Sequence, residues 1–144
     1  MGRAEKLIRS WYSDVWDAHK SDVDRRKAAL SLGDNSVIFH RVGAGGQDVV
    51  GVDAFLKFQR TLLDAFPDMT ITLESVIGSG DDVAVRWTST MTHKGEWMGR
   101  KPTGKKITLT GMGFSRIGEN GKAIEGWDEW DRYGLLKQID GAAS

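Results

Sequence analysis

Apolar residues recur at spacings of three and four in two stretches of the chain, which is the pattern of helices with one buried face. The first stretch covers residues 3–19 and the second covers residues 52–66, where Pro67 ends it. Between them, Ser21 is placed to cap a further helix that ends near Leu32. The pattern therefore predicts three helices in the first half of the chain.

From Thr70 onward the apolar period changes to two, which is the period of strands with one buried face. Short segments rich in glycine and aspartate separate the apolar runs and have the composition of hairpin loops. We expect four antiparallel strands in this half, over residues 70–77, 83–93, 106–117 and 123–131. A further short strand over 36–42 follows the turn residues Asp34 and Asn35, and a short segment over 133–139 closes the chain.

Helices followed by hairpin-connected strands predict an α+β architecture, in which N-terminal helices wrap one face of a curved antiparallel sheet. No internal repeat, low-complexity tract or linker divides the sequence, so residues 1–144 are expected to form one domain. A chain of this length buries roughly 68–70% of the surface that its unfolded state exposes, which is enough for one core.

Strand 83–93 indicates which of its faces is buried, whereas strand 123–131 does not. In the first, the odd-numbered positions are the more apolar and should face the helices, with His93 on that face at the strand's end. In the second, each face carries one tryptophan and at least one carboxylate, so both orientations stay open. Three strand glycines allow sheet curvature or the close approach of a ligand: Gly111, Gly113 and Gly126. A bent sheet under helices predicts one apolar pocket, the usual form of a small-molecule site.

Charge and composition exclude several classes of protein. Lys and Arg together number 20 and so do Asp and Glu, so the basic excess of a nucleic-acid-binding protein is missing. The sequence has no cysteine for a disulfide, a thiolate nucleophile or a zinc site, and its three histidines lack the spacing of a metal motif. No apolar run reaches the ~20 residues of a membrane span, and Met1 to Lys6 lack a signal-peptide core, so a cytoplasmic location is expected.

A series of short motifs occurs in a characteristic order between about Glu5 and Ile139. The motifs are Ala65-Phe66-Pro67-Asp68, Arg86-Trp87-Thr88, Thr92-His93-Lys94-Gly95-Glu96, Met98-Gly99, Pro102-Thr103-Gly104-Lys105, Gly121-Lys122-Ala123-Ile124-Glu125-Gly126-Trp127-Asp128, Trp130-Asp131 and Gly134-Leu135-Leu136-Lys137-Gln138. No single motif is specific, but the ordered set resembles the SnoaL-like polyketide cyclase and ester cyclase family.

The resemblance implies a cone-shaped α+β barrel, the fold shared with ketosteroid isomerase, scytalone dehydratase, limonene epoxide hydrolase and nuclear transport factor 2. Characterised polyketide members of the family close a ring by intramolecular aldol condensation, without metal or organic cofactor, and use a carboxylate and a histidine as acid and base. Two positions depart from the family pattern. Gly113 stands about where the family often carries an acid, and Gly126 stands where it often carries a histidine.

Aldol chemistry needs a base beside a carbonyl group and a donor for the oxyanion that develops. Asp128, flanked by Trp127 and Trp130, is the first candidate, because desolvation in an apolar wall raises the pKa of a carboxyl toward neutrality. His93 is the second, as an oxyanion donor or proton shuttle. Each also has a structural interpretation: the aspartate can face outward or hold a turn, and the histidine can bond to backbone.

Seven further residues are candidates for substrate contact. Aromatic and sulfur-containing side chains suit an apolar wall, although any one aromatic is more often plain core. His40 is expected at the pocket rim, and Arg86 either contacts the substrate or pairs with a carboxylate of the sheet. The expected wall residues are Trp11, Phe58, Trp97, Met112 and Trp127.

Three functions stay open at this point. The first is a cofactor-free cyclase or isomerase acting on a small apolar carbonyl compound. The second is a dehydratase or epoxide hydrolase of the same fold, although the Asp-Arg-Asp cluster of such hydrolases is missing because Thr88 follows Arg86 by two residues. The third is a non-catalytic small-molecule-binding domain, which Gly113 in place of an acid favours. A homodimer is expected, since sheet surfaces of this fold commonly pair.

Overall fold

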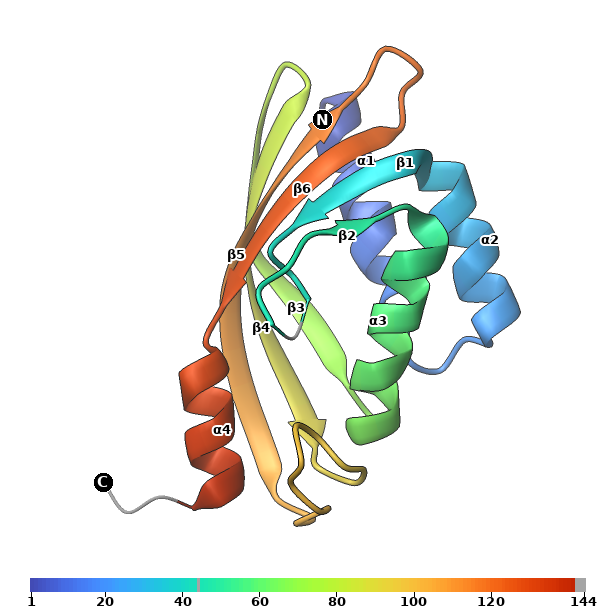
Figure 1. Ribbon diagram of the computed structural model, residues 1–144. Coiled ribbons are helices and arrows are strands. Elements are labelled where there is room, and N and C mark those ends of the chain that lie inside the picture. Colours follow the sequence, from blue (N-terminus) through green and yellow to red (C-terminus); the bar gives the residue numbers. More distant parts are fainter. Residues whose placement is uncertain (44, 142–144) are drawn as a thin grey trace.

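The computed structural model describes residues 1–43 and 45–141, which contain four α-helices, one π-helical turn and six strands (Figure 1). In chain order the elements are α1 (Arg3–Ser10), η1 (Trp11–Val15), α2 (Asp22–Leu32), β1 (Gly33–His40), β2 (Val49–Val50), α3 (Val52–Ala65), β3 (Thr70–Ser79), β4 (Asp82–Thr92), β5 (Lys106–Ile117), β6 (Ala123–Trp130) and α4 (Arg132–Asp140). The predicted α+β order of elements is confirmed. The Ser21 cap is confirmed too, because its side chain accepts a hydrogen bond from the Asp24 amide at 3.1 Å.

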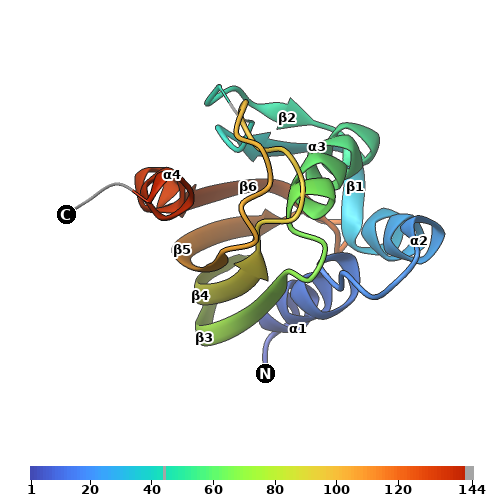
Figure 2. The same ribbon diagram turned by 90° about the horizontal axis from the view of Figure 1, so that it is seen from below.

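The six strands form one sheet in the order β2-β1-β6-β5-β4-β3. Strands β3 to β6 make the predicted antiparallel meander, and β1 joins it by a parallel pairing with β6 that the sequence pattern does not specify. Parallel neighbours need a long crossover, which α3 and the meander supply here. The sheet curves without closing, since β2 and β3 remain at its edges among the described strands, and the expected barrel is an open sheet. Seen end-on, α1 and α3 lie on the inner side of the curved sheet, α2 lies farther out beyond β1, and α4 lies on the opposite side of the sheet (Figure 2).

The first predicted helix is interrupted after Ser10. From Trp11 to Val15 the backbone widens into a single π-helical turn, in which the Trp16 amide bonds to the Trp11 carbonyl at 3.3 Å. Such turns are rare and occur often at functional sites, because they rotate the following side chains out of the α-helical register. The pattern of apolar spacing does not distinguish this turn from an ordinary helix.

Strand β1 begins at Gly33, directly after α2, so the expected turn at Asp34 and Asn35 is wrong. The pairing of β1 with β6 shifts register between Gly33 and Ile38, which is the mark of a bulge. The Asp34 carboxylate accepts the Ser36 amide at 3.0 Å inside this irregular stretch. The Asp34 side chain therefore stabilises a bulge within the strand and not a turn between two elements.

The two faces of the sheet are assigned by burial and pairing. On β4 the odd-numbered positions are buried and the even-numbered ones are exposed or half-buried, as predicted. On β6, Asp128 lies opposite Gly113 on the concave side, together with Gly126. Trp127 instead packs edge-on against Phe114, with ring centroids 5.6 Å apart. The even-numbered positions of β6 therefore face the helices, which answers the question left open by the sequence.

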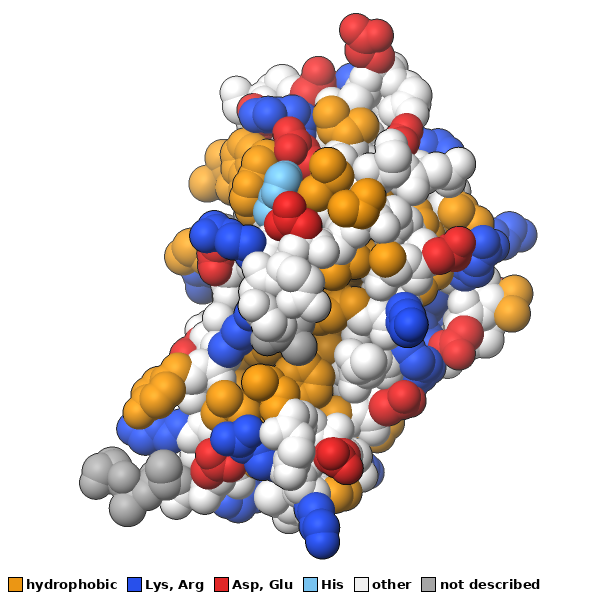
Figure 3. Space-filling model, viewed as in Figure 1, with side chains coloured by type: hydrophobic (Ala, Val, Ile, Leu, Met, Phe, Trp, Pro, Cys, Tyr) orange, Lys and Arg blue, Asp and Glu red, His pale blue; other side chains and the backbone are white. Residues whose placement is uncertain are grey.

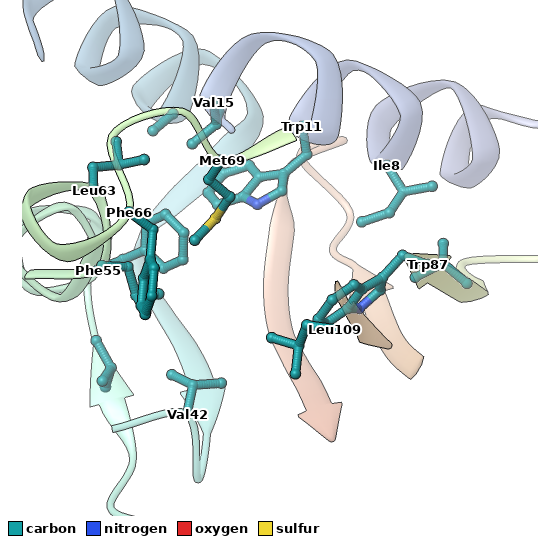
Figure 4. Close-up of a cluster of buried hydrophobic side chains, with 14 of the residues drawn as sticks. Ile8, Trp11, Val15, Val42, Phe55, Leu63, Phe66, Met69, Trp87 and Leu109 are labelled. Carbon is teal, nitrogen blue, oxygen red and sulfur yellow. The ribbon is translucent and has the colours of Figure 1, made fainter. Parts of the chain in front are cut away.

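A cluster of aromatic rings joins the helices to the concave face (Figure 4). Phe55 of α3 occupies its centre, with ring centroids 4.5 Å from Phe39, 5.1 Å from Trp11 and 5.6 Å from Trp16. Tilted aromatic pairs of this kind contribute about 0.5–1.5 kcal/mol each beyond the burial of their surface. The cluster forms a firm wall between the helices and the sheet.

Candidate functional site

A cavity of about 90 Å³ lies between the concave face, the N-terminal helices and α3, and it is partly open to solvent. Its lining is mainly aromatic and aliphatic, and the space-filling view shows apolar side chains gathered in the middle of this face of the molecule (Figure 3). Cavities of roughly 150 Å³ hold benzene, and ligand pockets commonly measure roughly 300–1,000 Å³. The cavity is therefore smaller than a site that holds one benzene ring, so a ring-sized ligand must extend into its open side or displace the aromatic walls.

Asp128 is the ionisable residue of this cavity wall whose pKa is most clearly suited to proton transfer. The pKa of its carboxyl is raised from 3.8 to about 7, chiefly by burial. A hydrogen bond from Trp87 and the charge of Arg132 act against this rise, and the charge of Glu129 adds to it. The residue keeps some accessible surface because it borders the cavity. A carboxyl with this pKa is present in both forms near neutral pH, as a general acid or base requires.

Tyr12 brings a hydroxyl group to the same place from the π-helical turn. Its burial, and then the charge of Asp128, raise the pKa of Tyr12 well above 10.0, so the hydroxyl keeps its proton and can donate a hydrogen bond. The oxygen lies 3.5 Å from the point where a Cβ atom on Gly113 would stand. Tyr12 therefore occupies the space in front of the position at which the family resemblance leads one to expect an acid.

The two glycines of β5 make room for these side chains. Trp87 of β4 lies across Gly111, where an added Cβ would overlap the indole ring and stand 2.9 Å from the Glu129 carbonyl oxygen. The indole N–H thereby donates to the Asp128 carboxylate at 3.2 Å. The bare backbone of β5 thus lets β4 and η1 present polar groups to a carboxylate on β6. Close approach of side chains is the physical reason for both glycines.

His93 lies away from this group. It is fully buried, packs on Phe66 with ring centroids 5.6 Å apart, and accepts the Thr103 amide at Nδ1 at 3.3 Å. It continues β4 eight residues beyond Val85, the position level with Asp128, which corresponds to roughly 25 Å of extended strand. It lies outside the described cavity lining, so the structure does not bring it together with Asp128.

The substrate-contact candidates divide between the cavity and other places. Trp11 and Phe58 border the cavity, whereas Trp127 borders it with its backbone and its ring packs on Phe114 on the opposite face of β6. Trp97 is buried outside the cavity lining, where it packs on Phe66, a residue that does border the cavity. Met112 is 61% exposed, because strand alternation on β5 turns it away from the two glycines.

Arg86 and His40 also lie outside the cavity lining. Arg86 is exposed on the even-numbered face of β4 and donates to the Ser75 hydroxyl at 3.4 Å. The His40 ring stacks on Trp127 with centroids 4.6 Å apart, and its Nε2 lies 3.1 Å from a Glu125 oxygen. Both side chains belong to the convex surface, so neither can touch a ligand held in the cavity.

Sequence reasoning missed three polar residues of the cavity: Tyr12, Trp87 and Ser89. Tyr12 was part of the apolar stripe of the first helix, and the π-helical turn that reorients it leaves no readable signal. Trp87 was placed on the correct face, but its partner was not identifiable. Ser89 had a signal, because it is a hydroxyl residue on the apolar face of β4.

Within residues 1–43 and 45–141, no three His, Cys, Asp or Glu side chains gather into a group that could hold a metal ion. No helix in this part of the chain is long and apolar enough to cross a membrane.

The curved sheet, the covering helices and the apolar cavity with one buried carboxyl define the class of the protein as a SnoaL-like α+β fold. The model of the SnoaL-like polyketide cyclase family matches residues 6–139, and the chain belongs to that family. Comparison with curated proteins found no match.

Solved structures share the fold at low sequence identity. A candidate SnoaL-like polyketide cyclase from Jannaschia sp. CCS1 is 20% identical, with a TM-score of 0.85 over 98% of this chain and 94% of its own. IdmH, a candidate polyketide cyclase from Streptomyces antibioticus, is 24% identical, with a TM-score of 0.78 over 96% and 99%. AclR, a candidate hydroxylase from Streptomyces galilaeus, is 24% identical, with a TM-score of 0.79 over 98% and 83%. Because the last two carry different activity names, the shared fold does not select one reaction.

Proposed function

We propose that the protein is a cofactor-free acid/base enzyme that enolises a small apolar carbonyl compound and then cyclises or isomerises it. The observation that carries this proposal is the Asp128 carboxyl, held in an apolar cavity with a pKa of about 7. Membership of the SnoaL-like polyketide cyclase family supports a carbonyl substrate. The cavity of about 90 Å³, partly open to solvent, supports a reacting part no larger than about one ring.

The proposed first step is removal of a proton next to the carbonyl group by the ionised Asp128. One carboxylate oxygen is held by the Trp87 N–H, which leaves the other free to take the proton. The electron pair of the broken C–H bond moves into the carbonyl group and forms an enolate. Its oxygen accepts a hydrogen bond from the Tyr12 hydroxyl, whose high pKa keeps the donor protonated.

Two outcomes return the proton. In cyclisation, the enolate carbon attacks a second carbonyl group of the same molecule, a carbon–carbon bond forms, and the new alkoxide takes the proton from Asp128. In isomerisation, the carboxyl group returns the proton to a different carbon. The position of His93 favours neither route, and it argues against a dehydratase that uses His93 and Asp128 as a facing pair.

Proton exchange on a simple ketone tests the proposal without knowledge of the natural substrate. Cyclohexanone in D₂O is followed by proton NMR, and the wild-type protein is expected to accelerate exchange of the α-protons. Asp128→Asn should remove the acceleration. Glu74→Gln, which changes an exposed carboxylate on β3, should retain it. Equal exchange with the wild-type protein and with Asp128→Asn would overturn the proposal.

A non-catalytic small-molecule-binding role is the second candidate. The observation in its favour is Gly113, which leaves Asp128 without a second acid at the position where the family often has one. Binding of cyclohexanone without any exchange above that of Asp128→Asn would select this role.

We also propose that two chains associate through the convex face of the sheet. Met112 is 61% exposed and Phe114 is 36% exposed there, beside Trp127. Neighbouring exposed apolar side chains of this kind are typical of interaction surfaces. Light scattering after size exclusion is expected to give twice the chain mass for the wild-type protein and a lower mass for Met112→Lys. A single-chain mass for the wild-type protein at all concentrations would contradict the dimer.

A further inference from the structure

The cavity wall contains a second polar position, Ser89 of β4. Ser89 is 2% exposed and lines the cavity, and its Oγ atom has no hydrogen-bond partner among the described residues. Its neighbours on the same face are Trp87 and Met91, and its partners on the flanking strands are Leu109 and Ile71. Buried hydroxyl groups are nearly always hydrogen-bonded, so an unpaired one that faces a cavity points to a missing partner in that cavity.

The spacing along β4 relates this hydroxyl to the proposed reaction centre. Ser89 follows Trp87 by one position on the same face, a step of roughly 7 Å in an extended strand. The indole N–H of Trp87 marks the place of the Asp128 carboxylate. Because Asp128 lies on β6, beyond β5, its carboxylate is farther from Ser89 than this step, roughly 10 Å when the spacing between strands is included. A six-membered ring with oxygens on opposite sides, and a hydrogen bond at each end, spans a distance of this order. A substrate can therefore have its reacting carbonyl near Asp128 and a second oxygen near Ser89.

We propose that Ser89 binds a second oxygen atom of the substrate, a hydroxyl or carbonyl group on the far side of the ring from the reacting carbonyl. This inference rests on the proposed function for the position of the reacting carbonyl. A serine hydroxyl both donates and accepts, so it pairs with either kind of oxygen. The substrate class is thus a small, otherwise apolar ring compound with two oxygen functions, and a compound with a single ketone should bind less tightly.

A matched pair of probes tests the subsite. Cyclohexanone has one oxygen, and 4-hydroxycyclohexanone has a second oxygen across the ring. Dissociation constants are measured by NMR titration for the wild-type protein, for Ser89→Ala and for Thr88→Val. Thr88→Val removes a hydroxyl from the opposite face of the same strand and serves as the control. The wild-type protein and the control are expected to prefer the hydroxyketone about fivefold to tenfold, which is the effect of one hydrogen bond, and Ser89→Ala should lose this preference.

The thermal midpoint of Ser89→Ala provides a second readout. Because the Ser89 hydroxyl has no protein partner in the described part of the chain, its removal should leave the midpoint unchanged or raise it. A clear drop in the midpoint would show that the hydroxyl already bonds to the protein and would overturn the subsite.

The subsite and the proposed function fail in different ways. A preference for the hydroxyketone that Ser89→Ala retains, or no preference in the wild-type protein, would overturn the subsite, and the hydroxyl then faces only water. Proton exchange that depends on Asp128 would still support the enzyme. Conversely, a preference that depends on Ser89, without any exchange, would support the subsite and overturn the enzyme.

Discussion

The indole N–H of Trp87 donates a hydrogen bond to the Asp128 carboxylate at 3.2 Å, across the strand that separates them. The contact joins β4 to β6 over the bare backbone of Gly111 in β5. It lowers the pKa of the carboxyl, whereas burial raises it, and the pKa that results from all these effects is about 7. Without this hydrogen bond, burial would hold the pKa of Asp128 higher. With it, the carboxyl can ionise at neutral pH, as a general base requires.

The substitution Trp87→Phe should shift the pH dependence of proton exchange to higher pH. Phenylalanine keeps most of the apolar contact but lacks the N–H that lowers the pKa of Asp128. Exchange requires the ionised carboxyl, so its midpoint, expected near pH 7 in the wild-type protein, should rise. The measurement is the rate of α-proton exchange on cyclohexanone between pH 5 and 9.

Trp97→Phe is the control for this shift, because Trp97 is buried outside the described cavity lining. Its pH profile should match that of the wild-type protein. A profile for Trp87→Phe with an unchanged midpoint would show that the N–H does not tune the carboxyl.

The helices and the meander could be predicted from the sequence because they follow from apolar periods that span many residues. Strand β4 has such a period, and its buried face was correctly assigned. The faces of β6 could not be assigned, because its two faces differ little in polarity. There the decisive information is the pairing of Asp128 with Gly113, which depends on the register between two strands.

The candidate site was only partly predictable for the same reason. Asp128 could be selected from its aromatic neighbours and the family resemblance. The separation of His93 from it is set by strand length and register, which motifs do not encode. Tyr12 enters the cavity through a π-helical turn, whose hydrogen bond spans five residues instead of four, and the apolar pattern of the sequence does not reveal that change.

The stability of the protein should fall as the pH rises from about 4 to about 7, owing to Asp128. In the folded state its carboxyl keeps the proton up to a pH of about 7, whereas in the unfolded chain it loses the proton near 3.8. Between these values the unfolded state binds fewer protons, so the free energy of unfolding decreases as the pH rises. The shift from 3.8 to about 7 corresponds to at most about 4 kcal/mol.

Thermal unfolding at pH 5 and pH 8 compares the wild-type protein with Asp128→Asn, which cannot ionise at this position. The midpoint of the wild-type protein should drop more between the two pH values than that of the variant. Parallel drops in both proteins would mean that the carboxyl ionises equally in the folded and unfolded states.

Gly111→Ala should damage both the fold and the acid/base group. The added Cβ overlaps the Trp87 indole and comes within 2.9 Å of the Glu129 carbonyl oxygen, so the indole must move away from Asp128. Overpacking of this kind costs about 1–3 kcal/mol. Denaturant unfolding should show this loss, and the exchange profile should shift as it does for Trp87→Phe.

Gly126→Ala is the matched control on the neighbouring strand. The atoms nearest to its added Cβ lie at 3.5 to 3.8 Å, which is ordinary van der Waals contact. Its stability and its exchange profile should stay close to those of the wild-type protein. If Gly111→Ala were equally harmless, the position of the indole across β5 would not matter for Asp128.

Tyr12→Phe should lower the rate of proton exchange while it leaves the fold intact. The variant keeps the aromatic ring in the cavity wall and loses only the hydroxyl that is proposed to bind the enolate oxygen. Removal of one oxyanion donor typically reduces the rate by about 10²–10³. Tyr133→Phe, which changes a tyrosine that is 76% exposed, should retain the full rate. The Tyr12 oxygen lies 3.5 Å from the Cβ position of Gly113, which pairs with Asp128, so the two groups face the same part of the cavity. A rate for Tyr12→Phe within twofold of the wild-type rate would place the oxyanion donor elsewhere in the cavity and would leave Asp128 as the base alone.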